Sequence, residues 1–356
     1  MQRLGMQLLF FALGVAAFPG CGLVDEDLSG CGTDYNLDYE LRMVTNMTTE
    51  IQTQLSMTTD VQISQTLQQY LSGVFTDYAH DVDLGFYDVV PDPSGRGDSL
   101  RLHHESHIMD ANQSSYTLYI PRRRYMHLAI ANVDGNEAVT LAADDRCHSA
   151  RLMQHAGDTV ASHRTGLFTA RLEMNIREDL KEDQTFDVNL FMTNCATSLV
   201  LDTLGTGIRD IRAYATGFAS GFRICDSVYV FRPKPPVVVA DRVDAESDGV
   251  VCFATVNFPS ADPKPIPSRT IIETEDPFVS EEATDPIWRY DIYTWMSDGS
   301  VTKSELGVMT PLRAGQLKII RAKVLTNGAV QPGDPTIGVS IQTDWNNGQE
   351  YPEVPL

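Results

Sequence analysis

The chain has 356 residues and a formal net charge of −21, with 27 basic and 48 acidic side chains. This length exceeds that of an ordinary single β-sandwich and suits two domains, each able to bury its own core. An acidic chain repels the phosphates of nucleic acids and the headgroups of anionic lipids, so neither is expected as a partner.

A short apolar segment opens the chain. Arg3 precedes an apolar run over residues 4–18, and Gly20 and Cys21 follow it. The run is shorter than the roughly 20 residues that span a bilayer, and its order is typical of a secretory signal peptide. We therefore predict a signal peptide over residues 1–20 and lipidation of Cys21, whose acyl chains would hold the protein on a membrane. The alternative is an ordinary cleaved signal followed by a structural cysteine. No transmembrane helix is expected.

The next part of the chain reads as a tether and a first domain. Residues 21–33 are predicted to be a lipid tether, and residues 34–163 an N-terminal β-sandwich. Apolar and polar residues alternate from the start of that domain, which is typical of a half-buried strand. A helical spacing of apolar residues from Val61 to Phe75, after Asp60 as a candidate cap, predicts one short helix. Strands are expected over residues 34–44, 82–86, 100–108, 116–120 and 125–133.

The alternation weakens over residues 144–165, which we interpret as the crossing into a second domain at residues 164–356. The turns Ser297-Asp298-Gly299 and Asn327-Gly328 are typical of hairpins. One strand, one helix and a series of hairpins predict two mainly β, antiparallel sandwiches in tandem. Strands are expected over residues 167–176, 185–191, 197–204, 208–216, 227–231, 250–258, 288–296, 301–308, 317–325 and 337–345.

Six cysteines leave several disulfide arrangements open. If Cys21 carries lipid, five remain, so at most two disulfides form and one thiol is left over. Cys225 and Cys252 lie in successive strand-like runs and could pair, and Cys31 could pair with Cys147. No CxxC pair is present, which disfavours a zinc ribbon or a redox motif.

A histidine-rich run is the nearest approach to a metal motif. His103, Glu105 and His107 would share one face of a strand, with the two histidines about 13 Å apart, too far to bind one ion. We therefore predict a solvated strand face and no metal site. No nucleophile, base and oxyanion donor come together, and no Gly-rich phosphate loop is present, so neither catalytic residues nor a cofactor are expected.

Two further patterns have competing interpretations. Arg122, Arg123 and Arg124 are interpreted as a solvated edge whose charges discourage strand pairing, with a trypsin-like cleavage site as the alternative. The strand at residues 288–296 carries aromatic side chains on both faces. We interpret one face as sandwich core and the other, with Tyr293 and Trp295, as a half-covered surface.

Taken in order, these features resemble the FimB-type anchor and accessory subunits of type V pili. The resemblance begins with Cys21, the acidic tether up to Cys31 and the alternating first strand. It continues through Val82-Asp83-Leu84-Gly85-Phe86-Tyr87-Asp88, residues 116–120 and residues 125–132 in the first domain. In the second domain it covers residues 208–222 and 338–345.

The resemblance implies two transthyretin-like sandwiches, an outer-membrane anchor and a non-enzymatic role in fimbria assembly. Such subunits pair with pilins by strand exchange, in which one subunit's strand fills a groove in the next. Loss of the first strand would detach the lipid anchor here, so an anchor subunit is favoured over a shaft subunit. The alternative is a surface lipoprotein that acts as an adhesin or glycan-binding module outside a pilus. A secreted hydrolase is a remote third hypothesis.

Overall fold

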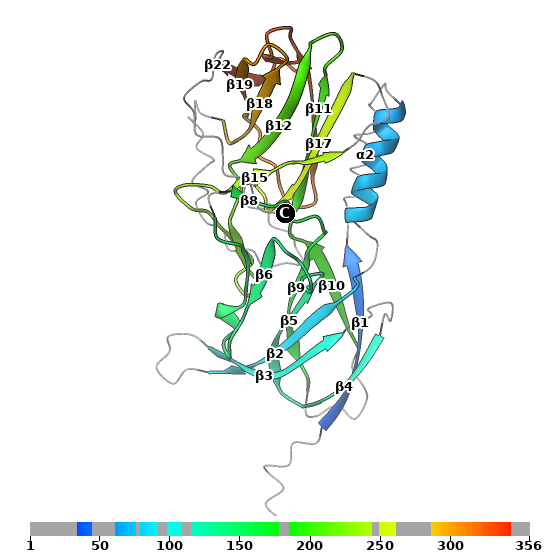
Figure 1. Cartoon of the computed structure of the whole chain (residues 1–356). Coiled ribbons are helices and arrows are strands. Elements are labelled where there is room, and N and C mark those ends of the chain that lie inside the picture. The colour runs from blue at the N-terminus through cyan, green and yellow to red at the C-terminus, as the bar shows by residue number, and fades with distance from the viewer. Residues whose placement is uncertain are drawn as a thin grey trace, which may run out of the picture.

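Four β-sheets account for most of the residues that the computed structural model describes (Figure 1). The structure describes residues 34–44, 61–75, 79–91, 98–108, 115–157, 159–177, 185–243, 249–260 and 286–342. One α-helix lies among these residues, so the mainly β fold with a single helix is confirmed for them. The predicted signal peptide and tether, together with Cys21, Cys31 and the candidate cap Asp60, lie outside the described residues.

The largest sheet has seven strands and forms the lower half of the molecule in Figure 1. In β3, exposed and partly buried side chains alternate along the strand. In spatial order it contains β3 (Ser99–Ile108), β2 (Val82–Val90), β5 (Arg124–Ala131), β9 (Phe168–Asn175), β10 (Thr185–Met192), β1 (Asp34–Val44) and β4 (Ser115–Pro121).

A small four-stranded sheet covers one face of this large sheet. Its strands are β14 (Val228–Val230), β13 (Gly221–Arg223), β7 (Arg151–Gln154) and β6 (Val139–Ala142), with the 3₁₀ turn η2 (Cys147–Ser149) between β6 and β7. Met126, Leu128 and Ile130 of β5 share a buried cluster with Leu152 and Phe222 of the small sheet. The two sheets therefore form the first sandwich.

The second sandwich lies in the upper half of Figure 1. Its six-stranded sheet is ordered β22 (Ile337–Gln342), β19 (Val301–Val308), β18 (Trp288–Met296), β12 (Ile208–Thr216), β15 (Val237–Val239) and β8 (Thr159–Val160). Its five-stranded sheet is ordered β16 (Asp241–Val243), β17 (Val250–Asn257), β11 (Cys195–Asp202), β20 (Leu317–Val324) and β21 (Val330–Pro332). Trp288, Tyr290 and Ile292 point into the core between these sheets, as predicted. The Tyr290 hydroxyl is satisfied there by Thr197.

The helix α2 (Val61–Val74) was expected within the first domain, but it runs beside β17 of the second sandwich (Figure 1). Leu67, Leu71 and Val74 follow helical spacing and share a buried cluster with β2, β11 and β17 residues. The Tyr70 hydroxyl donates to Asp241 of β16 at 3.0 Å, and Arg164 donates to the same carboxylate at 2.7 Å. The helix therefore packs where the two halves meet.

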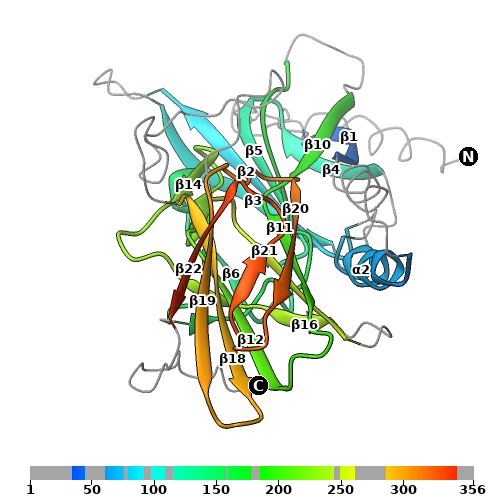
Figure 2. The ribbon, with the colours of Figure 1, turned by 90° about the horizontal axis from the view of Figure 1, so that it is seen from above.

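Two long strand pairs depart from the antiparallel pairing that the sequence predicted. β1 runs parallel to β10, and β11 runs parallel to β20. Parallel neighbours need long crossover connections. More than a hundred residues separate the members of each of these two pairs along the chain. Figure 2, which views the molecule from above, shows β11 and β20 side by side.

Strands that precede residues 163 and 164, where the second domain was expected to begin, share sheets with strands that follow them. β9 continues the large sheet through eight paired positions with β5, and β10 joins it to β1. In the small sheet, β7, which precedes this point, pairs with β13, which follows it, through Leu152 and Phe222. Strands from both sides of that point therefore build the first sandwich, because each of its two sheets is completed by later sequence.

Candidate functional site

The strand that follows the predicted tether lies inside the large sheet and not at its edge. β1 pairs with β10 from Asp38 to Val44 and with β4 from Asp34 to Glu40. The first part of β1 is therefore paired with β4, its last part with β10, and residues 38–40 with both strands. A pull on the preceding segment would load both neighbouring strands. No helix in the described residues is long and apolar enough to cross a membrane.

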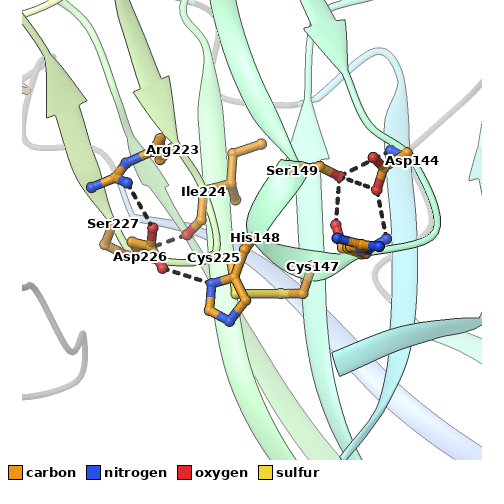
Figure 3. Close-up of a disulfide and its surroundings, with 10 residues drawn as sticks. Asp144, Cys147, His148, Ser149, Arg223, Ile224, Cys225, Asp226 and Ser227 are labelled. Atoms are coloured by element: carbon orange, nitrogen blue, oxygen red, sulfur yellow. Dashed lines mark hydrogen bonds and ion pairs between the residues drawn. A yellow bond between two sulfur atoms is a disulfide. The ribbon is translucent and has the colours of Figure 1, made fainter. Parts of the chain in front are cut away.

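The structure joins Cys147 to Cys225, a pairing that the sequence analysis did not propose (Figure 3). Their Cα atoms lie 5.7 Å apart because β7 and β13, which pair with each other, bring η2 next to the turn after β13. The expected pairs Cys225–Cys252 and Cys31–Cys147 are therefore wrong. Cys252 is a buried cysteine on β17, in a different sheet.

Polar contacts flank this disulfide on both strands (Figure 3). His148 lies beside Asp226, with Nδ1 and Oδ1 2.9 Å apart, and Arg223 lies 3.4 Å from the same carboxylate. On the other side, the Asp144 carboxylate accepts one hydrogen bond from the Ser149 hydroxyl and one from the Arg146 backbone amide. Both hydrogen bonds lower the pKa of Asp144. Because the Cys225 sulfur is bonded to Cys147, it is not a free ligand for a metal beside His148 and Asp226.

The other cysteine in the described part of the chain is also buried. Cys195 is fully buried at the start of β11, and burial raises the pKa of its thiol. A thiol that resists ionisation is a poor nucleophile and a poor metal ligand. Cys195 and Cys252 are therefore structural residues of the sheet.

The histidine-rich run of β3 does not place its side chains on one face. A bulge opposite Phe86 and Tyr87 leaves His103 outside the pairing register, with His104 opposite Phe86 and Leu102 opposite Tyr87. The Nδ1 atom of His103 then lies 3.2 Å from Oδ2 of Asp88. The Nδ1 atom of His107 lies 2.7 Å from Oδ1 of Asp83, which is on the face of β2 opposite to that of Asp88. The hydrogen bond that the His107 ring donates to Asp83 raises the pKa of His107. The expectation of a shared face is therefore wrong for His103.

The three arginines lie at the turn between β4 and β5. Arg123 donates to Asp88 at 3.2 Å, and Arg124 lies 3.9 Å from Glu173 on β9. The Arg123 side chain is 48% exposed, so its ion pair with Asp88 is solvated and contributes little to stability.

The aromatic residues of β18 lie as predicted: Tyr293 and Trp295 form a separate cluster on the outer face.

A buried histidine that the sequence analysis did not single out lies near the junction of the two halves. His163 is 2% exposed, and neither ring nitrogen has a hydrogen-bond partner within the described residues. Its ring packs edge-on against Phe258, with centroids 4.7 Å apart. Burial lowers the pKa of His163 to about 3, and burial also lowers the pKa of His127 to about 4.

These two histidines predict acid sensitivity. An unfolded histidine has a pKa of about 6.5, so between pH 6.5 and pH 3 the unfolded chain binds protons that the folded chain excludes. Stability is therefore present at neutral pH and lost as the pH falls through this window. We expect His163→Leu to reduce the loss of unfolding free energy between pH 6 and pH 4 by roughly 2 kcal/mol. Urea titrations at the two pH values measure it.

The matched control for this prediction is His155→Gln, because His155 is exposed. It should leave the acid sensitivity unchanged. A His163→Leu variant that loses as much stability as the parent protein between the two pH values would contradict the assignment of acid sensitivity to this buried ring.

Comparison with known proteins identifies the fold. No protein-family model matches the chain, and no curated protein matches it. A candidate adhesin from Bacteroides ovatus has a similar structure, with 13% identity and a TM-score of 0.50 over 85% of this chain and 94% of that chain. A second B. ovatus candidate adhesin structure has 12% identity and a TM-score of 0.51 over 89% of this chain and 96% of that chain.

The fimbrial anchor protein Mfa2 from Porphyromonas gingivalis is also among the matches, with 9% identity and a TM-score of 0.43 over 87% of this chain and 99% of that chain. At identities of 12% and 13%, the B. ovatus structures show a shared fold. They confirm, at the level of the fold, the resemblance that the sequence indicated.

Proposed function

We propose that this protein is a non-enzymatic outer-membrane lipoprotein that acts as an anchor or accessory subunit in fimbria assembly. The observation that carries the proposal is the position of β1, which follows the predicted tether and is paired on both sides by β10 and β4. A lipid on Cys21 would then be connected to an interior strand of a seven-stranded sheet, next to its edge strand β4, a suitable arrangement for a subunit that bears load.

The proposed partner is a pilin. In strand exchange, main-chain hydrogen bonds supply affinity, and alternate side-chain pockets supply specificity. Because β1 already occupies the space between β10 and β4, this subunit would not accept a donated strand there. It would instead donate a strand to the first pilin and end the fibre at the membrane.

A second candidate is a surface lipoprotein adhesin outside a pilus. The observation that favours it is that the two B. ovatus proteins of the same fold are described as candidate adhesins. Both candidates require export and a lipid anchor, and they differ in whether fibres depend on the protein.

The anchor is tested by Cys21→Ser followed by membrane fractionation. A single acyl chain binds membranes only marginally and several chains bind stably, so we expect the parent protein in the membrane fraction and the variant in the soluble fraction. Cys31→Ser is the matched control, because it removes a nearby cysteine and should leave the protein in the membrane. A Cys21→Ser variant that remains in the membrane fraction would disprove the lipid anchor.

A further inference from the structure

A cleft of about 400 Å³ opens between the β2–β3 edge of the large sheet and β6 of the small sheet. Its polar lining consists of Asp83 and Tyr87 from β2 with Glu105 and His107 from β3. Leu102 and Leu141 supply apolar walls. A cavity of this size, mostly apolar with a few convergent polar groups, matches the usual construction of a small-ligand site.

Strand register explains why these side chains converge. Glu105 lies opposite Gly85, and His107 lies opposite Asp83. Tyr87 is two residues beyond Gly85, so its side chain points to the same face. The Tyr87 ring lies over Gly85: a Cβ at Gly85 would lie 2.9 Å from Tyr87 Cε2 and 3.3 Å from its hydroxyl. The missing side chain of Gly85 therefore lets the phenol lie along the strand towards Glu105.

The Tyr87 hydroxyl is an unused polar group. Tyr87 is only 4% exposed, and its hydroxyl has no hydrogen-bond partner among the described residues. Because the Tyr87 side chain lines the cleft, this hydroxyl is available to a ligand.

The charge around this hydroxyl is negative. Burial, then the charges of Glu105 and Asp144, raise the pKa of Tyr87. Asp83 is paired with His107 at 2.7 Å, whereas Glu105 is exposed and forms no ion pair within the described residues. The uncompensated negative charge in the cleft is therefore that of the Glu105 carboxylate, which acts on the Tyr87 phenol.

We propose that this cleft binds an alkylammonium group, either a small amine or a lysine side chain. An ammonium donates hydrogen bonds, which the Tyr87 phenol oxygen and the Glu105 carboxylate would accept. The alkyl stem would lie along Leu102 and Leu141. A neutral sugar could use the same hydrogen bonds but would gain nothing from the negative charge. This inference does not depend on the proposed fimbrial role.

The test uses isothermal titration calorimetry of the mature chain with n-hexylamine. Glu105→Gln should lower the affinity about tenfold, because a charge-assisted hydrogen bond is lost. Tyr87→Phe should lower it about fivefold, because it removes only the phenol oxygen. Glu173→Gln, an exposed acid on β9 outside this cleft, is the matched control and should bind hexylamine like the parent protein. Thermal unfolding of each variant establishes that it is folded.

Two ligand controls complete the test. n-Hexanol has the same stem without the charge and should bind at least tenfold more weakly than hexylamine. The peptide Gly-Lys-Gly separates the two sources of the ammonium: binding as tight as that of hexylamine supports a lysine side chain, and weaker binding supports a free amine. Hexylamine affinity unchanged by Glu105→Gln, or methyl glucoside binding more tightly than hexylamine, would overturn the proposal.

Discussion

Replacing Cys147 and Cys225 together with alanine is expected to lower the free energy of unfolding by about 4 kcal/mol. The disulfide joins residues 78 positions apart, so its loss releases a long loop in the unfolded chain. It also removes the covalent connection between η2 and the turn after β13. Urea unfolding of the parent and variant proteins under oxidising conditions measures the difference.

A reducing agent supplies the internal control for this prediction. Reduction should destabilise the parent protein by a similar amount and leave the double variant unchanged. Equal stability of the parent protein with and without the reductant would contradict a disulfide between these two residues.

Trp288→Ala is expected to cost about 4 kcal/mol, because it leaves a large cavity in the second sandwich. Trp288 is 1% exposed, and its indole Nε1 donates to the Thr310 carbonyl at 3.0 Å. Its ring also packs against Phe218, with centroids 5.5 Å apart. Chemical unfolding of the variant measures the loss.

Trp295→Ala is the matched control for this variant. It deletes the same side chain from the same strand, but from the half-covered outer face, where Arg212 lies 5.1 Å above the ring centroid. Its cost should be less than half that of Trp288→Ala, because less apolar surface returns to water. Equal losses from the two variants would mean that the two faces of β18 have been assigned incorrectly.

Long strands were the most predictable part of the fold. β1, β12, β18 and β19 have the predicted bounds, because alternation over eight or more residues is a strong signal. The hairpins at Gly299 and Gly328 were also predicted, and both glycines adopt the positive φ that such turns need. In contrast, β6, β7, β8 and β13 were missed, because two to four residues are too short to show a period.

The arrangement of these strands could not be derived from local patterns. The disulfide depends on β7 and β13 becoming neighbours, and residues 70 positions apart carry no mutual signal in one sequence. Likewise, the bulge that separates His103 from His107 is a property of the β2–β3 pairing. The cleft at Tyr87 was missed for the same reason, since its walls come from two sheets.

The predicted signal peptide, tether and lipidation at Cys21 stay predictions, and the proposed role depends on them. The fold is shared with candidate adhesins, and a shared fold leaves open whether fibres require the protein. What separates an anchor from an independent adhesin is therefore the behaviour of the fibres themselves.

Electron microscopy of cells that produce the Cys21→Ser variant tests the anchor role most directly. If the protein ends the fibre at the membrane, fibres should be released into the medium or change in length, whereas cells with the Cys31→Ser variant should retain normal fibres. Fibres of normal length that remain attached to Cys21→Ser cells would contradict the proposed role as a membrane anchor.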